Sequence, residues 1–195
     1  MYHIGAFGSI EVSLAETKEG KLYHMNKKQE ANALVIECIT EALLEMMEKR
    51  PFNSITITDL TKRAGVGRVS FYRNFESKEE VIRRHLNNLI DEWSGQYGDT
   101  GQEPSGLNEK MFEYFYQNRE LYIMLYRQGL AHISLQSIMD VCGPKPEQPN
   151  ALAYFTSFIA HGIYGWIEEW FKRGVQETPK EMVALYEQTQ KSDSK

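Results

Sequence analysis

The chain has 195 residues, of which 42% are hydrophobic and 25% are charged, and it carries a formal net charge of −5 at pH 7. A chain of this size can bury a sizeable core in one or two domains, and it contains no apolar run of about 18 residues, so we expect no transmembrane helix. Cys38 and Cys142 are far apart and lack metal-ligand spacing, so we expect inert core thiols rather than a disulfide or redox sensor, which fits a reducing cytoplasm.

Residues 1–24 differ from the rest of the chain. They lack the basic start and continuous apolar segment of a secretory signal, and the alternating Ile10, Val12 and Leu14 have no second strand to pair with. Met25, followed by Asn-Lys-Lys, resembles a natural start with a short basic arm. We therefore expect residues 1–24 to be a leader, tag or misassigned extension that is disordered and lies outside the fold.

Residues 27–49 have the apolar spacing of a long amphipathic helix, which Pro51 ends. The apolar residues recur at steps of three and four and so share one face: Ala31, Leu34, Val35, Cys38, Ile39, Ala42, Leu43 and Met46.

The next segment, residues 58–78, predicts two short helices joined by a tight turn. Thr58 is placed to cap the first helix, Leu60 and Ala64 are its apolar residues, and Gly65 stands where it must stop. In the second helix, at 68–75, we expect Phe71, Phe75 and Val69 to point inward at helical spacing. The polar or amphipathic remainder is Arg68, Ser70, Tyr72, Arg73 and Asn74. A helix-turn-helix of this kind places its second helix in the major groove of DNA.

The charge distribution supports this interpretation. Residues 49–84 contain nine Lys or Arg and four Asp or Glu, a local charge of +5, whereas the remainder of the chain sums to −10. Binding to phosphates needs a local basic face, not a basic protein. A further helix from Lys78 to about Gly95 begins with Ser77 and Glu80 as a capping box and would join this region to the rest of the chain.

Residues 27–93 resemble the DNA-binding domain of the TetR family of bacterial transcriptional regulators. The matching motifs are Pro-Phe-x-x-Ile-Thr-Ile-x-x-Leu at 51–60, Ala-Gly-Val at 64–66, Phe-Tyr-x-x-Phe at 71–75 and Ser-Lys-Glu-Glu at 77–80. The resemblance implies that Arg68, Ser70 and Arg73 face the groove, and that Thr58, Tyr72 and Lys78 hold phosphates.

Two positions depart from the family pattern. Gly67 replaces the usual Ser or Thr cap of the recognition helix, at a cost of about a few tenths of a kcal/mol, and we count it among the DNA-contacting residues. Val69 replaces a residue that is often small.

The C-terminal half predicts further helices and no sheet. After a Gly-rich linker at 94–106, helices are expected at 107–117, 119–127, 130–141, 150–173 and 179–189, with Gly174 and Pro179 between the last two. The expected fold is all-α, with a three-helix helix-turn-helix domain joined by its connecting helix to a C-terminal bundle. We divide the chain into the leader at 1–24, a DNA-binding domain at 25–93, and a dimerisation and effector domain at 107–190.

The helix at 150–173 is apolar on nearly all sides, so we expect it to be buried on nearly all sides. One side carries Leu152, Phe155, Ile159, Ile163, Trp166 and Trp170. The other side, with Tyr186 of the next helix, would meet a second subunit through Tyr154, Phe158, His161, Gly162 and Gly165. Residues 107–190 resemble the C-terminal domain of a Firmicutes-type branch of the family, through Tyr-Phe-Tyr-Gln-Asn-Arg-Glu-Leu-Tyr at 114–122 and His-Gly-Ile-Tyr-Gly-Trp at 161–166.

The resemblance also implies a hydrophobic effector held between helices of this domain, and we expect Tyr122, Tyr126, Phe155 and Ile159 to line its site. An aromatic stripe at this spacing also fits an ordinary core. No phosphate loop, zinc-protease helix or nucleophile elbow is present, so neither catalysis nor a metal or other cofactor is expected. We therefore predict a cytoplasmic, homodimeric repressor that an effector releases from a double-stranded DNA operator. The alternative is a coactivator of the same fold that acts through a partner protein.

Overall fold

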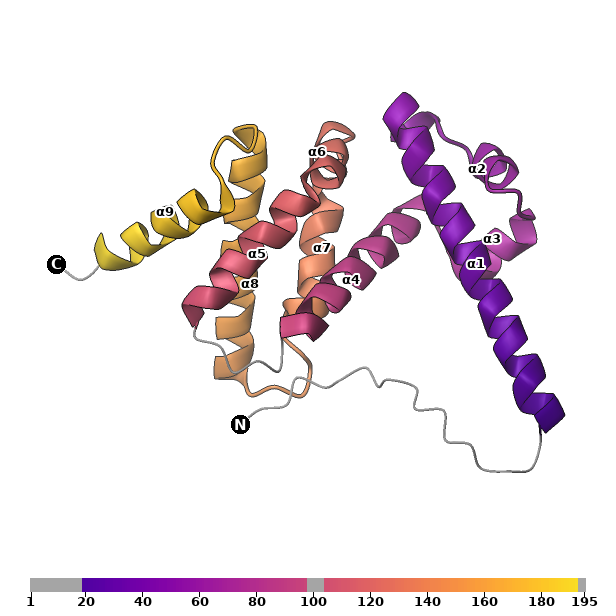
Figure 1. Ribbon diagram of the computed structural model, residues 1–195, viewed down its shortest axis with the longest axis horizontal. Helices are drawn as coiled ribbons and strands as arrows, with labels where there is room; N and C mark the ends of the chain where they lie inside the picture. Colours follow the sequence, from indigo (N-terminus) through magenta and orange to yellow (C-terminus); the bar gives the residue numbers. More distant parts are fainter. Residues whose placement is uncertain (1–18, 98–103, 193–195) are drawn as a thin grey trace. The chain divides into compact units, whose positions relative to one another are not determined.

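The computed structural model describes residues 19–97 and 104–192 of the chain, and every regular element within these ranges is a helix, as the sequence predicts (Figure 1). The contacts divide the chain into two compact units, Met1–Val81 and Ile82–Lys195. The boundary falls inside α4 (Lys78–Tyr97), which begins in the first unit and continues into the second. None of the described helices is both long and apolar enough to span a bilayer.

The first unit contains α1 (Glu19–Lys49), the short 3-10 helix η1 (Phe52–Ser54), α2 (Ile57–Arg63) and α3 (Arg68–Asn74). α1, α2 and α3 each pack against the other two (Figure 1). Their common core consists of apolar side chains that are almost fully buried: Ile39, Leu43, Met47, Phe52, Ile55, Leu60, Phe71, Phe75 and Val81.

α1 is longer than the sequence predicts, because it begins at Glu19 and not at residue 27. Residues 19–24 of the expected leader are therefore helical, since no proline interrupts the segment between them and the rest of the helix. The remainder of that expected leader lies outside the described residues. Among the α1 side chains from Lys27 on, full burial begins at Ile39, whereas Leu34 of the predicted apolar face is exposed.

The cap of α2 is Thr56 and not Thr58. The Thr56 hydroxyl accepts a hydrogen bond of 3.0 Å from the Asp59 N–H, and the Asp59 carboxylate accepts one of 3.4 Å from the Thr56 N–H. Thr56 and Asp59 have the spacing of a capping box, which Thr58 cannot form because Thr61 stands three residues after it. These bonds to Thr56 lower the pKa of Asp59.

The end of α2 agrees with the prediction. Gly65 has φ of +68°, the left-handed conformation that glycine adopts without strain. The Val66 N–H bonds to the Thr61 carbonyl at 3.0 Å and the Gly65 N–H bonds to the Lys62 carbonyl at 3.3 Å, which is a Schellman ending.

The inward face of α3 differs from the prediction at one residue. Phe71 and Phe75 are buried, but the Val69 side chain is 73% exposed. Residues two apart on a helix lie on opposite sides, so Val69 cannot share the face of Phe71. Val69 therefore belongs to the exterior of the unit.

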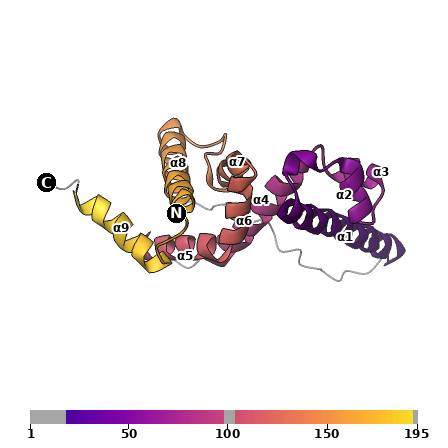
Figure 2. The ribbon, with the colours of Figure 1, turned by 90° about the horizontal axis from the view of Figure 1, so that it is seen from above.

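The second unit contains the rest of α4 with α5 (Pro104–Gln117), α6 (Arg119–Arg127), α7 (Ala131–Cys142), α8 (Asn150–Lys172) and α9 (Pro179–Ser192). α8 packs against α7 and α6, and α5 packs against α6 and α9 (Figures 1 and 2). The break between α4 and α5 is shorter than the predicted linker at 94–106, because α4 continues to Tyr97 and α5 begins at Pro104.

The core of the second unit is largely aromatic. Tyr122 of α6 stacks on Phe171 of α8 with ring centroids 5.6 Å apart, and Phe171 stacks on Trp170 at 6.0 Å. Trp170 also contacts two residues of α5. The Tyr116 ring stacks on it with centroids 6.1 Å apart, and the Phe112 ring meets it edge-on at 5.8 Å. These contacts hold α5 and α6 against the C-terminal half of α8.

Candidate functional site

The outer surface of the helix-turn-helix is formed by side chains of α2 and α3. Arg68, Tyr72 and Arg73 of α3 and Lys62 of α2 are all exposed. Within the described residues, Lys62, Arg68 and Arg73 form no ion pair with a carboxylate. Their charges are therefore available to a phosphate backbone.

Two other basic residues of this region are used in the fold. Arg50 pairs with Asp59 at 3.2 Å, and Arg63 pairs with Glu45 of α1. Both pairs connect α2 to the end of α1 or to the segment that follows it. The net charge of +5 counted over residues 49–84 is therefore larger than the charge that the surface of α2 and α3 presents.

Lys78, predicted to hold a phosphate, has its ammonium against the protein backbone. Lys78 Nζ donates to the carbonyls of Phe52 at 2.8 Å and Ile55 at 2.6 Å, and it lies 4.2 Å from the centroid of the Phe52 ring. Burial lowers the pKa of Lys78. An ammonium has three N–H donors, so one remains for a phosphate, while the other two hold the start of α4 against η1.

The remaining predicted DNA contacts differ in exposure. Tyr72 is exposed, with its ring held edge-on against Phe71 at 5.4 Å, and Thr58 is exposed in the first turn of α2. Ser70 is half-buried. Gly67 caps α3 without a side chain, and no heavy atom lies within 4 Å of the position a Cβ would take there.

Asn74 has a structural role that the sequence interpretation missed. Its Nδ2 donates to the Ser70 carbonyl at 2.9 Å, and its Oδ1 accepts a hydrogen bond of 2.9 Å from Asn32 Nδ2 of α1. The pair fixes the C-terminal end of the recognition helix on α1. The only signal in the sequence was an amide at the last position of a short helix.

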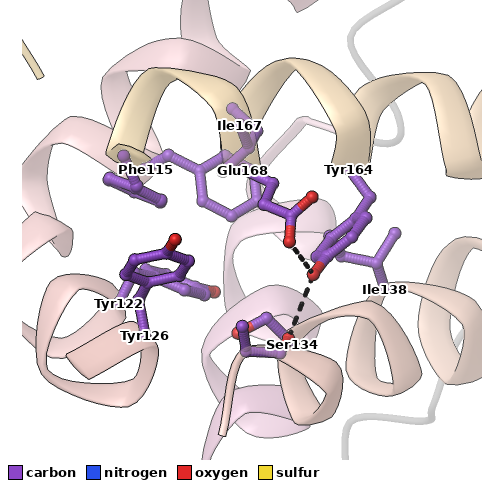
Figure 3. A pocket seen from close by; sticks show the side chains of 10 residues that line it. Phe115, Tyr122, Tyr126, Ser134, Ile138, Tyr164, Ile167 and Glu168 are labelled. Carbon is purple, nitrogen blue, oxygen red and sulfur yellow. Dashed lines mark hydrogen bonds between the residues drawn. The ribbon is translucent and has the colours of Figure 1, made fainter. Parts of the chain in front are cut away.

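The second unit has a pocket between α5, α6, α7 and α8, shown in Figure 3. Five of its lining residues are aromatic: Phe115, Tyr122, Tyr126, Tyr164 and Phe171. Its volume is about 20 Å³, which is room for little more than one water molecule. Side chains must move before a larger molecule can enter.

Glu168 lies at this pocket and is connected to two donors. Its Oε1 accepts a hydrogen bond of 3.2 Å from the Tyr164 hydroxyl (Figure 3). Its Oε2 lies 3.1 Å from Lys172 Nζ. Burial, with the neighbouring Glu168 charge as a smaller cause, raises the pKa of Tyr164 to about 12. Tyr164 is therefore a neutral donor at physiological pH.

Tyr122 belongs to the inner wall of the pocket. Its hydroxyl is 3.1 Å from that of Tyr114, and burial raises the pKa of Tyr122 well above its ordinary value. Tyr126, in contrast, is 41% exposed. The predicted effector residues Tyr122 and Tyr126 thus both line the pocket, one deep and one near solvent.

Phe155 and Ile159, the other two predicted effector residues, do not line the pocket. Their side chains are 62% and 39% exposed on the outer side of α8. The buried stripe of α8 runs through Ala160, Ile167 and Phe171. Because α8 is apolar on nearly all sides, its spacing left the choice of inward face open.

The outer side of α8 from Leu152 to Gly165 is largely apolar and exposed. Tyr154 and Phe158 are each 73% exposed, and Gly162 and Gly165 have no heavy atom within 4 Å of an added Cβ. Leu152, Phe155, Ile159 and His161 are also exposed there. Tyr186 of α9 is half-buried, with its ring 5.7 Å from that of Trp166. We call the exposed residues from Leu152 to Gly165 the outer α8 face.

Comparison with known families identifies both units. The family of bacterial regulatory proteins named after tetR matches residues 39–84, and a transcriptional regulator C-terminal region of the TetR type matches residues 102–192. The chain belongs to the TetR family. The first match contains α2, α3 and their basic surface, and the second contains the pocket and the outer α8 face.

A curated relative is a transcriptional regulator of the helix-turn-helix type. The TetR-family chain is 23% identical over 93 residues to the HTH-type negative transcriptional regulator IcaR of the biofilm operon icaADBC from Staphylococcus epidermidis. The match covers 46% of this chain and 50% of the relative, so the chain spans about half of the relative's length.

Solved structures show the same fold. Lin0861 from Listeria innocua superposes with a TM-score of 0.63 at 17% identity, over 80% of this chain and 90% of that one. A TetR transcriptional regulator from Streptococcus agalactiae superposes with a TM-score of 0.52 at 17% identity, over 83% and 96%. The all-α fold predicted from the sequence is therefore confirmed, and the two family matches above confirm the predicted TetR family.

Proposed function

We propose that this TetR-family regulator is a homodimeric repressor that a small hydrophobic or aromatic effector releases from its operator. The observation that carries the proposal is the exposed, unpaired charge of Arg68 and Arg73 beside Tyr72 on the outer side of α3. IcaR is a negative transcriptional regulator, which supports repression as the direction of control.

The contacts to DNA divide by type. Arg68, Arg73 and Ser70 stand on α3, the helix that a helix-turn-helix inserts in the major groove, where they would read bases. Thr58, Tyr72, Gly67 and the remaining N–H of Lys78 would contact the backbone and fix the position of the helix. Val69, exposed beside them, adds an apolar contact suited to a thymine methyl group.

The outer α8 face supports the second subunit. An apolar, aromatic surface on one helix is the kind of surface that is buried in subunit interfaces. Gly162 and Gly165 allow a second backbone to approach, because nothing occupies the space beside them. A two-fold dimer pairs the same face on both subunits and presents two recognition helices to two half-sites. In addition to the residues predicted from the sequence, the proposed interface includes Leu152, Phe155 and Ile159.

The pocket supports release by an effector. A ligand shifts an equilibrium only if it binds one state better than the other. With about 20 Å³ of room the pocket is too small for such an effector, so ligand entry must displace side chains between α6 and α8. That displacement supplies the difference between an empty and an occupied state.

A mobility-shift titration on the promoter region of the protein's own gene, repeated at several salt concentrations, tests the proposal. We expect binding whose affinity falls steeply with salt and is lost in Arg73→Ala. Lys180→Ala is the matched control, because Lys180 is an exposed cation of α9, outside the helix-turn-helix. No shift at any salt, together with a stable complex to another protein, would favour the coactivator instead.

A further inference from the structure

We propose that the pocket between α5, α6, α7 and α8 selects organic cations, namely an ammonium-type group on an apolar or aromatic body, through Glu168 and the rings around it. The inference rests on the proposed function in one respect only, that the pocket receives a ligand. It adds the charge and the chemical class of that ligand.

The first argument is the charge of the lining. Among the side chains that line the pocket, Glu168 is the only one that carries a charge at neutral pH, and no Lys or Arg is among them. An anionic ligand would have to approach this carboxylate without a lining cation to receive it. A cationic ligand finds an opposite charge in a site from which its own binding excludes water, where the attraction is stronger than at the surface.

The second argument is the unused capacity of the carboxylate. A carboxylate offers about four acceptor positions, and within the described residues Glu168 uses them for the Tyr164 hydroxyl and Lys172 Nζ. Because Tyr164 is a neutral donor, it orients the carboxylate without cancelling its charge. The hydroxyl also lies 3.4 Å from the Ala131 carbonyl, and its single hydrogen can serve one acceptor at a time (Figure 3).

Lys172 does not close the site to another cation. It forms an i,i+4 pair with Glu168, its side chain is 39% exposed, and it is not among the lining residues. Exposed pairs of this kind are weak because water solvates both partners. A ligand cation inside the pocket would compete with Lys172 for the Glu168 carboxylate. The Lys172 ammonium would then be solvated by water.

The third argument is the set of aromatic rings. Phe115, Tyr122, Tyr126, Tyr164 and Phe171 surround the space (Figure 3). Ring faces attract cations, and cages of this composition recognise quaternary ammonium groups. Tyr122 and Phe171 are stacked and buried, whereas Tyr126 is 41% exposed and is the ring that can swing out to admit a ligand.

The test compares two probes of the same shape in the full-length protein, without DNA. Benzyltrimethylammonium carries the positive charge, and neopentylbenzene has a carbon in place of the nitrogen. By calorimetric titration we expect the cation to bind about tenfold more tightly than its uncharged isostere. In Glu168→Gln, which keeps the shape and removes the charge, the preference should disappear.

Glu169→Gln is the matched control. Glu169 forms the same i,i+4 pair with Arg173 at 2.7 Å, but it does not line the pocket. It should leave the preference for the cation unchanged, and thermal unfolding should show that both variants are folded. Equal affinity for the two probes in the unchanged protein, no binding of either probe, or an equal loss in both variants would overturn the inference.

The result is separable from the proposed function. A protein that shifts operator DNA but shows no preference for the cation refutes the charge selectivity alone. A protein that prefers the cation but never binds DNA refutes the repressor and leaves the pocket chemistry standing.

Discussion

Asn32 of α1 donates a hydrogen bond of 2.9 Å to Oδ1 of Asn74, the last residue of the recognition helix. Together with the 2.9 Å bond from Asn74 to the Ser70 carbonyl, it ties the C-terminal end of α3 to α1. The DNA-reading surface thus depends on an amide pair that need not touch DNA.

Breaking this pair should affect stability and DNA binding together. We expect Asn74→Ala and Asn32→Ala each to lower the free energy of unfolding by about 1 kcal/mol, the usual net contribution of one hydrogen bond. The double variant should lose less than the sum of the two, since the residues share one bond. Urea unfolding of the four proteins measures this coupling, and full additivity would show that the bond contributes nothing.

A serine at position 67 should stabilise the recognition helix. Gly67 has φ of −78° and ψ of 149°, ordinary values for a capping residue, and its Cβ position is empty. Gly67→Ser should therefore raise the unfolding free energy by about a few tenths of a kcal/mol.

Gly65→Ser is the contrasting change, because Gly65 has φ of +68°. Although its Cβ position is also empty, the left-handed backbone should make this variant less stable, by about 1 kcal/mol. Thermal unfolding that moves both variants in the same direction would contradict the assignment of the two glycines.

Two equally exposed apolar side chains should separate assembly from DNA binding. Phe158 and Val69 are each 73% exposed, one on the outer α8 face and one on α3. Phe158→Asp places a charge in the proposed interface and should shift sedimentation toward the monomer. Val69→Asp should keep the dimer and weaken operator binding, since it adds a negative charge beside phosphates. A dimer that persists in Phe158→Asp would place the interface elsewhere.

His85 predicts a pH dependence of stability. Burial lowers its pKa below 6.5, while the charge of Glu92 opposes this to a smaller extent. Between the folded pKa and 6.5, the unfolded chain binds a proton that the folded chain does not, so acidification favours unfolding. Stability from this group is therefore present above pH 6.5 and is lost as the pH falls toward the folded pKa.

His85→Asn should flatten this part of the profile. The measurement is the unfolding free energy of both proteins from pH 8 to pH 5, taken as a difference so that other titrating groups cancel. Parallel profiles would show that His85 keeps its ordinary pKa in the folded protein.

The sequence predicted most of what depends on neighbours along the chain. Gly65 ends α2 as expected, and the helices of the second unit begin and end within a few residues of their predicted bounds. Thr58 was wrong as a cap because two threonines stand two residues apart, and only Thr56 has an acidic residue three positions later.

What depends on packing between helices was less accessible. α8 has apolar residues in every direction, so nothing in its spacing distinguished Phe155 and Ile159 from the small Ala160 that is in fact buried. The pocket needs residues of α5, α6, α7 and α8 at once, which the spacing within any single helix does not bring together.

The aromatic stack has a practical consequence for observing this protein in solution. All three tryptophans, Trp93, Trp166 and Trp170, belong to the second unit, and the first unit has none. Indole emission therefore reports on the second unit alone, while circular dichroism reports on the helices of both units. A transition that changes the dichroism but not the tryptophan fluorescence can therefore be assigned to the first unit, which contains the helix-turn-helix, without any added label.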